Sequence, residues 1–168
     1  AEEDDRRRDL FDLGEAAEQR FRLERELRHA IGAGELRLYL QSQVDAAGRL
    51  AGAEVLVRWQ HPRDGLVAPG VFIPVAEESD LIVGLGDWVL ASACALLAQP
   101  VFTERRLRLS VNLSARQFRQ DNFVPRLRYL LVAADADPRL LTLEVTEGLV
   151  IDDFDAAVAK MRELAALG

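Results

Sequence analysis

The chain has 168 residues, of which 49% are hydrophobic and 29% charged, and these values are typical of one globular domain. Its net charge of −7 argues against a broad basic face for a DNA or RNA polymer, so an anionic ligand would need local arginines or bound cations. No apolar run approaches the roughly 18 residues of a membrane span, the charged N-terminus has no signal-peptide core, and the single Cys94 forms no internal disulfide. We therefore expect no membrane contact by this segment.

The first 32 residues are predicted to form one helix. Leu23, Leu27, Ala30 and Ile31 recur at helical spacing, and charged residues occupy the other faces. We interpret residues 1–32 as a helical lead-in that packs on the next domain, or as a signalling helix that couples an upstream domain to it.

Period-two alternation then predicts two strands, over residues 36–41 and 50–59. Ala46, Ala47 and Gly48 form a turn between them, so we expect an antiparallel hairpin.

The later elements alternate between helix and strand. In chain order we expect a loop over 62–69, a helix over 72–97 that Pro100 ends, and a strand over 107–113. A helix capped by Ser114 and Gln117 then runs to Ala134 with a break near Pro125, and a strand follows over 140–146. Asp152 or Asp153 caps the last helix, whose apolar face comprises Phe154, Val158, Met161 and Ala165. This order predicts a parallel α/β sheet or barrel.

Three of these strands carry a polar face late in their run. The faces comprise Glu54, Leu56 and Arg58, then Ser110, Asn112 and Ser114, and then Thr142, Glu144 and Thr146. In a barrel they would line the lumen near the catalytic mouth, so we expect Glu54, Asn112 and Glu144 to converge. Two carboxylates about 4–5 Å apart repel by roughly 3–4 kcal/mol, and oxygen ligands suit Mg²⁺, Mn²⁺ or Ca²⁺. The pattern alone fits solvent-facing rim residues as well, with Arg58 as a surface cation.

Several segments also resemble, in order, the motifs of the EAL-domain family. They are Leu38–Asp45, Gly52–Trp59, Phe72–Glu77, Ser110–Ser114 and Leu143–Glu147. The resemblance implies an α/β fold, a TIM-like (β/α)₈ barrel with an antiparallel first strand, of which residues 33–168 supply about four strands. It also implies hydrolysis of cyclic di-GMP to linear pGpG with two divalent metal ions, Mg²⁺ or Mn²⁺, and inhibition by Ca²⁺.

The resemblance carries roles over residue by residue. It implies Glu54, Asn112 and Glu144 as metal ligands, with Glu54 and Glu144 catalytic, Arg58 as a phosphate contact, Gln41 as a guanine contact, Leu56 as part of the pocket wall, Pro74 near a base, and Glu147 as a support for a mobile loop or the metal site. Glu147 as a plain rim charge remains open. Val55 replaces the alanine of the family motif, and we expect this change to be tolerated because its side chain points away from the lumen.

The family's later motifs, including a catalytic lysine, are expected beyond Gly168, so part of the metal site would come from outside these residues. The segment Ile151–Asp155 only superficially resembles one of these motifs and is interpreted as a helix cap. The 168 residues alone are expected to be inactive.

The lead-in is similar to connectors that follow GGDEF domains, which implies a GGDEF partner in cis. A homodimer stays open, and the resemblance implies a cytoplasmic domain in parents that are often anchored in the inner membrane. Three functions are weighed: an active phosphodiesterase, a degenerate domain that acts as a cyclic di-GMP receptor, and a purely structural domain.

Overall fold

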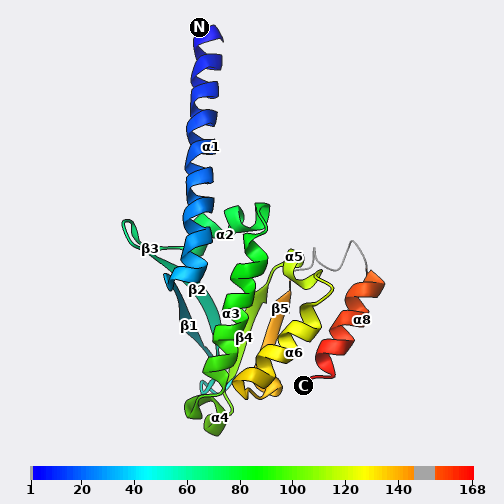
Figure 1. Ribbon diagram of the computed structural model, residues 1–168. Coiled ribbons are helices and arrows are strands. Elements are labelled where there is room, and N and C mark those ends of the chain that lie inside the picture. Colours follow the sequence, from blue (N-terminus) through cyan, green and yellow to red (C-terminus); the bar gives the residue numbers. More distant parts are fainter. Residues whose placement is uncertain (1, 146–153) are drawn as a thin grey trace.

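The computed structural model describes residues 2–145 and 154–168, with side chains from Gly14 onward. A long helix, α1 (Glu2–Ala33), projects from a body in which helices cover one face of a mixed sheet (Figure 1). The strands are β1 (Leu36–Val44), β2 (Leu50–His61), β3 (Gly65–Val67), β4 (Arg108–Leu113) and β5 (Leu141–Val145). The other helices are α2 (Pro69–Glu78), α3 (Leu81–Leu97), α4 (Pro100–Arg105), α5 (Ala115–Phe118), α6 (Phe123–Ala134) and α8 (Phe154–Ala165), with a 3₁₀ turn, η1 (Pro138–Leu140).

The sheet has the strand order β1-β2-β4-β5. β1 and β2 form the predicted antiparallel hairpin, whereas β2, β4 and β5 run parallel. Parallel neighbours need long crossovers, which the helices supply. The predicted α/β class with an antiparallel first strand is therefore confirmed.

Two apolar clusters hold the helices to the sheet. The larger lies between the parallel strands and helices α3 and α6, and Val55, which is 4% exposed, belongs to it, as predicted from its alternation. The smaller joins the end of α1 to the body through Leu27, Ala30, Trp59 and Phe72, all fully buried. Because each buried leucine contributes roughly 1.5–3 kcal/mol, the predicted apolar face of α1 anchors its last turns firmly.

The prediction of one helix over 72–97 was wrong. Two helices, α2 and α3, meet at Ser79, whose backbone is extended and whose Oγ donates to the carbonyl of Val75 at 2.9 Å. This local hydrogen bond competes with the helical pattern. Pro100 was also misread, because it begins α4 rather than ending α3.

Three further boundaries differ from the prediction. The expected loop over 62–69 contains β3, which pairs antiparallel with β2. The break near Pro125 lies instead between α5 and α6, since Pro125 sits in the first turn of α6, where a missing N–H costs little. Ser114 caps α5 as predicted by accepting from the Gln117 N–H at 3.1 Å.

The apolar face predicted for the last helix is confirmed in part, because Met161 packs against the larger cluster and Val158 is half-buried. Ala157 is its buried residue, while Phe154 is 63% exposed and Ala165 is exposed. The predicted caps Asp152 and Asp153 lie outside the described residues, as does Thr146.

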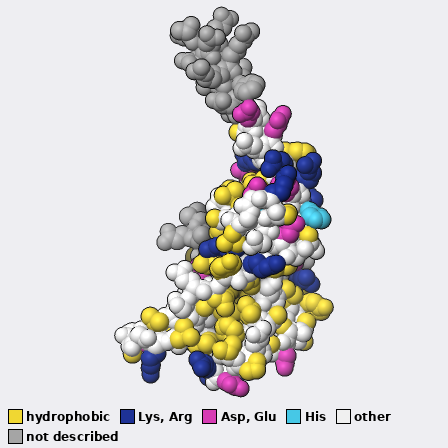
Figure 2. All heavy atoms as spheres, turned by 90° about the vertical axis from the view of Figure 1, so that its left-hand side faces the viewer, with side chains coloured by type: hydrophobic (Ala, Val, Ile, Leu, Met, Phe, Trp, Pro, Cys, Tyr) yellow, Lys and Arg dark blue, Asp and Glu magenta, His cyan; other side chains and the backbone are white. Residues whose placement is uncertain are grey.

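Figure 2 shows the face on the side of β1 and β3. Cationic side chains gather where α1 enters the body, and hydrophobic side chains cover much of the surface below. Across the described ranges, no helix combines the length and apolarity needed to cross a membrane.

Candidate functional site

The polar face predicted for three strands lies on the side of the sheet opposite the helices. On β2, Ala53 and Val55 are buried in the helix-covered core, so Glu54 and Leu56 point the other way. The same alternation places Asn112 of β4 and Glu144 of β5 on the exposed face. In a closed barrel this exposed face would be the lumen.

The sheet register brings the predicted ligands together. Asn112 Nδ2 donates to Glu54 Oε1 at 2.8 Å, and Asn112 is the direct register partner of Glu144. On the other side, Gln41 of β1 pairs with Glu54. Four neighbouring strands therefore present Gln41, Glu54, Asn112 and Glu144 in one row; the convergence of the last three was expected from the sequence, whereas the place of Gln41 was not.

The donor chemistry of this row fits a hard divalent cation. Glu54 and Glu144 supply carboxylates. Among residues 14–145 and 154–168, neither the Glu144 carboxylate nor Asn112 Oδ1 has a hydrogen-bond or ion-pair partner. No group of three or more His, Cys, Asp or Glu side chains that could hold a metal occurs in the described part of the chain. The three predicted ligands in this row, Glu54, Asn112 and Glu144, provide two carboxylates and one amide, so they could supply only part of the coordination shell.

A cavity of about 520 Å³ opens beside this row at the carboxyl ends of β2, β4 and β5. Its wall includes Leu56, Ile73, Glu77, Asn112, Ser114 and Glu144. Leu56 lines this cavity, whereas Pro74 is exposed on α2 and does not. Sequence reasoning missed Ile73 and Glu77, although they lie in the segment that carries Pro74.

A second cavity of about 340 Å³ lies between β5, α6 and α8, and the described residues that line it include no charged side chain.

Arg116 fixes the wall of the larger cavity. Its Nη1 donates to the carbonyl oxygens of Glu77 at 2.9 Å and Ser79 at 3.1 Å, and its Nη2 pairs with Asp80 Oδ1 at 2.9 Å. A cation at the carboxyl end of α2 is favourable because the helix carbonyls concentrate negative charge there. The α5 segment that follows β4 thus holds the end of α2 in place.

Arg58, the predicted phosphate contact, donates from Nη1 to the carbonyl oxygen of Val57 at 2.9 Å. Its guanidinium lies over the ring of Tyr39, 5.7 Å from the centroid. Glu147 lies outside the described residues, so its proposed supporting role stays a prediction.

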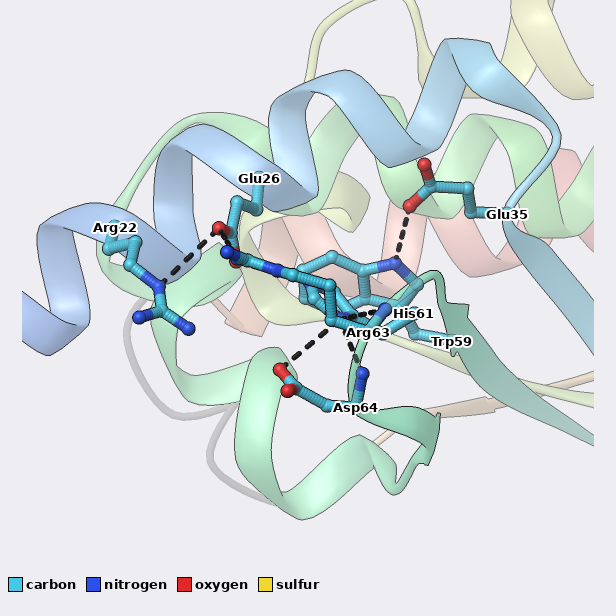
Figure 3. Close-up of polar contacts among 7 residues, drawn as sticks. All are labelled: Arg22, Glu26, Glu35, Trp59, His61, Arg63 and Asp64. Atoms are coloured by element: carbon cyan, nitrogen blue, oxygen red, sulfur yellow. Dashed lines mark hydrogen bonds and ion pairs between the residues drawn. The ribbon is translucent and has the colours of Figure 1, made fainter.

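A polar junction that the sequence did not predict ties α1 to the end of β2 (Figure 3). The buried His61 accepts at Nδ1 from the N–H groups of Arg63 and Asp64, at 3.3 and 3.1 Å. With Nδ1 accepting these bonds, the ring proton is placed on Nε2, which donates to Glu26 Oε2 at 3.1 Å, and Nδ1 also lies 3.2 Å from Asp64 Oδ2. Glu26 also pairs with Arg63.

Glu35 adds a second tie, because it accepts a hydrogen bond from Trp59 Nε1 at 2.9 Å. Burial acts to raise the pKa of Glu26, but the hydrogen bond with His61 and the charges of Arg63 and Arg22 outweigh it, so the pKa lies below its ordinary value of 4.5. The end of β2 is thereby fixed to α1.

Comparison with known proteins identifies relatives of the whole described body. The EAL domain model matches residues 24–168. An uncharacterized signaling protein of Caulobacter vibrioides is 40% identical over 158 residues, which cover 94% of this chain and 19% of the relative. The bifunctional diguanylate cyclase/cyclic di-GMP phosphodiesterase MucR of Pseudomonas aeruginosa is 37% identical over 164 residues, 90% of this chain and 22% of MucR. Cyclic di-GMP phosphodiesterase PA2567 of the same organism is 37% identical over 158 residues, 93% of this chain and 27% of the relative.

Solved structures show the same fold. The MucR phosphodiesterase in complex with c-di-GMP superposes with a TM-score of 0.83 at 38% identity, over 88% of this chain and 60% of that one. The EAL enzyme Bd1971, in a form bound to cAMP and cyclic-di-GMP, gives a TM-score of 0.84 at 28% identity, over 96% of this chain and 46% of that one. The chain spans 19% to 27% of the length of the three curated relatives.

Proposed function

Because the chain belongs to the EAL-domain family, we propose that it is part of an enzyme that hydrolyses the second messenger cyclic di-GMP to linear pGpG. The observation that carries the proposal is the row of Glu54, Asn112 and Glu144 on three adjacent strands, beside a cavity of about 520 Å³. The names of MucR and PA2567, and the c-di-GMP complex of MucR, support the choice of substrate.

Glu54, Asn112 and Glu144 would hold divalent cations, which we propose to be Mg²⁺ or Mn²⁺. Bound there, such ions would lower the pKa of a water molecule and stabilise negative charge on a phosphodiester. Three protein oxygens do not fill the octahedral shell that Mg²⁺ prefers, so water, the substrate or further protein oxygens would complete it. The hydrogen bond from Asn112 to Glu54 holds two of the ligands in a fixed orientation before substrate arrives.

The remaining site residues would bind and orient the substrate. Arg58 would pair with a phosphate, since its planar guanidinium matches two phosphate oxygens. Gln41, which lies opposite Glu54, would contact a guanine edge, and Leu56 would shape the cavity wall. Pro74 would lie near a base, and Glu147 would support the metal site or a mobile loop.

The same proposal extends to the arrangement of domains. Residues 1–32 would be a lead-in from an upstream GGDEF domain, and residues 33–168 the first part of the barrel. MucR, whose name joins a diguanylate cyclase to a phosphodiesterase, supports such a pairing. The proposed location is the cytoplasm. Light scattering of the intact protein would distinguish a monomer from a homodimer.

The test is a cyclic di-GMP hydrolysis assay on the intact protein with Mn²⁺, in which pGpG is separated by chromatography. Glu54→Gln should lower kcat at least about 100-fold, because a charged metal ligand becomes a neutral amide. Glu104→Gln, an exposed carboxylate on α4, is the matched control and should leave kcat unchanged.

The assigned site would be refuted if Glu54→Gln formed pGpG as fast as the unchanged protein. Tight binding of cyclic di-GMP without pGpG would instead favour the receptor function, in which the domain senses the nucleotide without cleaving it.

A further inference from the structure

Two arginines face each other across the β1–β2 hairpin. Arg37 and Arg58 are register partners, so both side chains start on the exposed lumen face of the sheet. Like charges that lie directly opposite in a sheet destabilise it. Within the part of the chain that the structure describes, neither guanidinium has a carboxylate partner. Arg37 donates to the carbonyls of Gly34 at 2.6 Å and Leu36 at 2.8 Å, and Arg58 to that of Val57 at 2.9 Å.

Tyr39 lies between these arginines and the metal-ligand row. It is the register partner of Leu56, which lines the cavity, and the residue is 48% exposed. The guanidinium carbon of Arg58 sits 5.7 Å from the ring centroid, within the range of a cation–π contact. This contact fixes one guanidinium of the pair without neutralising it.

A second arginine–tyrosine cation–π contact in the chain differs from this one in having a carboxylate partner. On α6, Arg126 lies 5.6 Å from the ring centroid of Tyr129, but Arg126 also pairs with Asp87 of α3 at 3.3 Å. The outer stack therefore has its own anion, and the stack on the lumen face has none among the described residues. Two opposed, unneutralised guanidiniums on the same exposed face as Glu54 suit an anion from solution.

We propose that Arg37, Tyr39 and Arg58 together form a phosphate subsite for the cyclic dinucleotide. Arg37 is the second phosphate contact, and Tyr39 is a positioning residue that holds the Arg58 guanidinium. The subsite rests on the proposed function, which assigns Arg58 alone. A phosphate diester fits because planar guanidinium forks match its oxygens and because its negative charge relieves the repulsion between the arginines.

Calorimetric titration of the intact protein with cyclic di-GMP, with Ca²⁺ present to prevent turnover, tests the subsite. Arg37→Met should raise the Kd about tenfold, because a charge-assisted contact is lost, and should make the Kd less sensitive to salt. Tyr39→Leu should raise it about two- to fivefold, whereas Tyr39→Phe, which keeps the ring, should match the unchanged protein. The controls Arg126→Met and Tyr129→Leu should leave the Kd unchanged.

A purely structural role for Arg37 predicts a different stability. Arg37→Met removes the repulsion with Arg58 but also the hydrogen bonds to the carbonyls of Gly34 and Leu36, so the thermal midpoint is compared at low and high salt. If the subsite is right, the effect of Arg37→Met on the midpoint should be more favourable at low salt, where the repulsion is strongest, while the substitution weakens binding. A purely structural Arg37 would lower the midpoint equally at both salt concentrations. The subsite alone would be refuted if the unchanged protein binds cyclic di-GMP and the Kd values of Arg37→Met and Tyr39→Leu lie within twofold of its Kd. No binding by the unchanged protein would refute the proposed function and the subsite with it.

Discussion

The junction between α1 and β2 makes a quantitative prediction for Glu26→Ala. Glu26 is 20% exposed and accepts the Nε2–H of His61, a side chain that is 3% exposed (Figure 3). The substitution leaves this buried donor without an acceptor. It also removes the ion pairs with Arg63 and Arg22, whose side chains are 61% and 55% exposed.

The loss of the buried hydrogen bond and the loss of the exposed ion pairs differ in size. A buried donor left unpaired costs about 1–3 kcal/mol, whereas an exposed ion pair contributes less than about 1 kcal/mol. We expect Glu26→Ala to lower the free energy of unfolding by about 2 kcal/mol. For a domain of this size, that corresponds to a fall in the thermal midpoint of about 4–8 °C. Glu26→Gln, which keeps an acceptor oxygen for His61, should lose about half as much.

Thermal unfolding followed by circular dichroism at neutral pH measures these differences. The matched control is Glu24→Ala on the same helix, where Glu24 pairs with Arg28 at 3.0 Å and both side chains are more exposed. It should change stability by less than about 0.5 kcal/mol. Equal effects of Glu24→Ala and Glu26→Ala would refute the role of the buried His61 contact.

The pH dependence of stability follows from the same contact. The folded pKa of Glu26 lies below 4.5, so the unfolded chain takes up the proton first as the pH falls. The stability that Glu26 contributes is therefore fully present above pH 4.5 and is lost as the pH falls through the folded pKa. Glu26→Gln should lack this part of the acid destabilisation, and the two unfolding curves should converge at low pH.

Three further substitutions test how the body is held together. Gly52→Ala should cost at least about 3 kcal/mol, because its Cβ would lie 2.3 Å from the carbonyl oxygen of Arg108, whereas Gly70→Ala, which points into open space, should be neutral in thermal unfolding. Lys160→Met removes contacts of 2.8 and 3.0 Å to two carbonyls at the end of α5, so amide exchange in α8 should quicken about tenfold. Arg116→Met should raise the KM for cyclic di-GMP with little change in kcat, because the cavity wall loosens; an unchanged KM would show that the wall does not depend on this side chain.

Periodicity predicted the strands better than it predicted where helices stop. β2 alternates over most of its length, so its existence and its two faces followed from the sequence. β3 has three residues, too few to show a period of two. The apolar stripe that predicted a single helix begins at Leu85, beyond the junction, so it carried no information about the polar run Glu77–Asp80, where the hydroxyl–carbonyl bond of Ser79 ends α2.

Periodicity also predicted part of the candidate site. Alternation placed Glu54 and Asn112 on one face, but the alignment of neighbouring strands depends on a register that no single strand encodes. Neither the pairing of Gln41 with Glu54 nor the α1 junction could be predicted in that way. Glu26 and His61 are 35 residues apart, and each alone is an ordinary polar residue.

Strand β2 links the two polar centres of this structure. Because successive side chains alternate, Trp59 is buried against α1 and α2 while the preceding Arg58 faces the lumen. The backbone that carries Arg58 is thus held from the covered face by fully buried aromatic packing and by the Glu35 hydrogen bond to Trp59. On the exposed face, Tyr39 and Asn112 then orient individual side chains of the same strand. A rigid strand with opposite tasks on its two faces explains why polar residues interrupt an otherwise apolar parallel strand at positions 54 and 58, where the ligand chemistry is proposed.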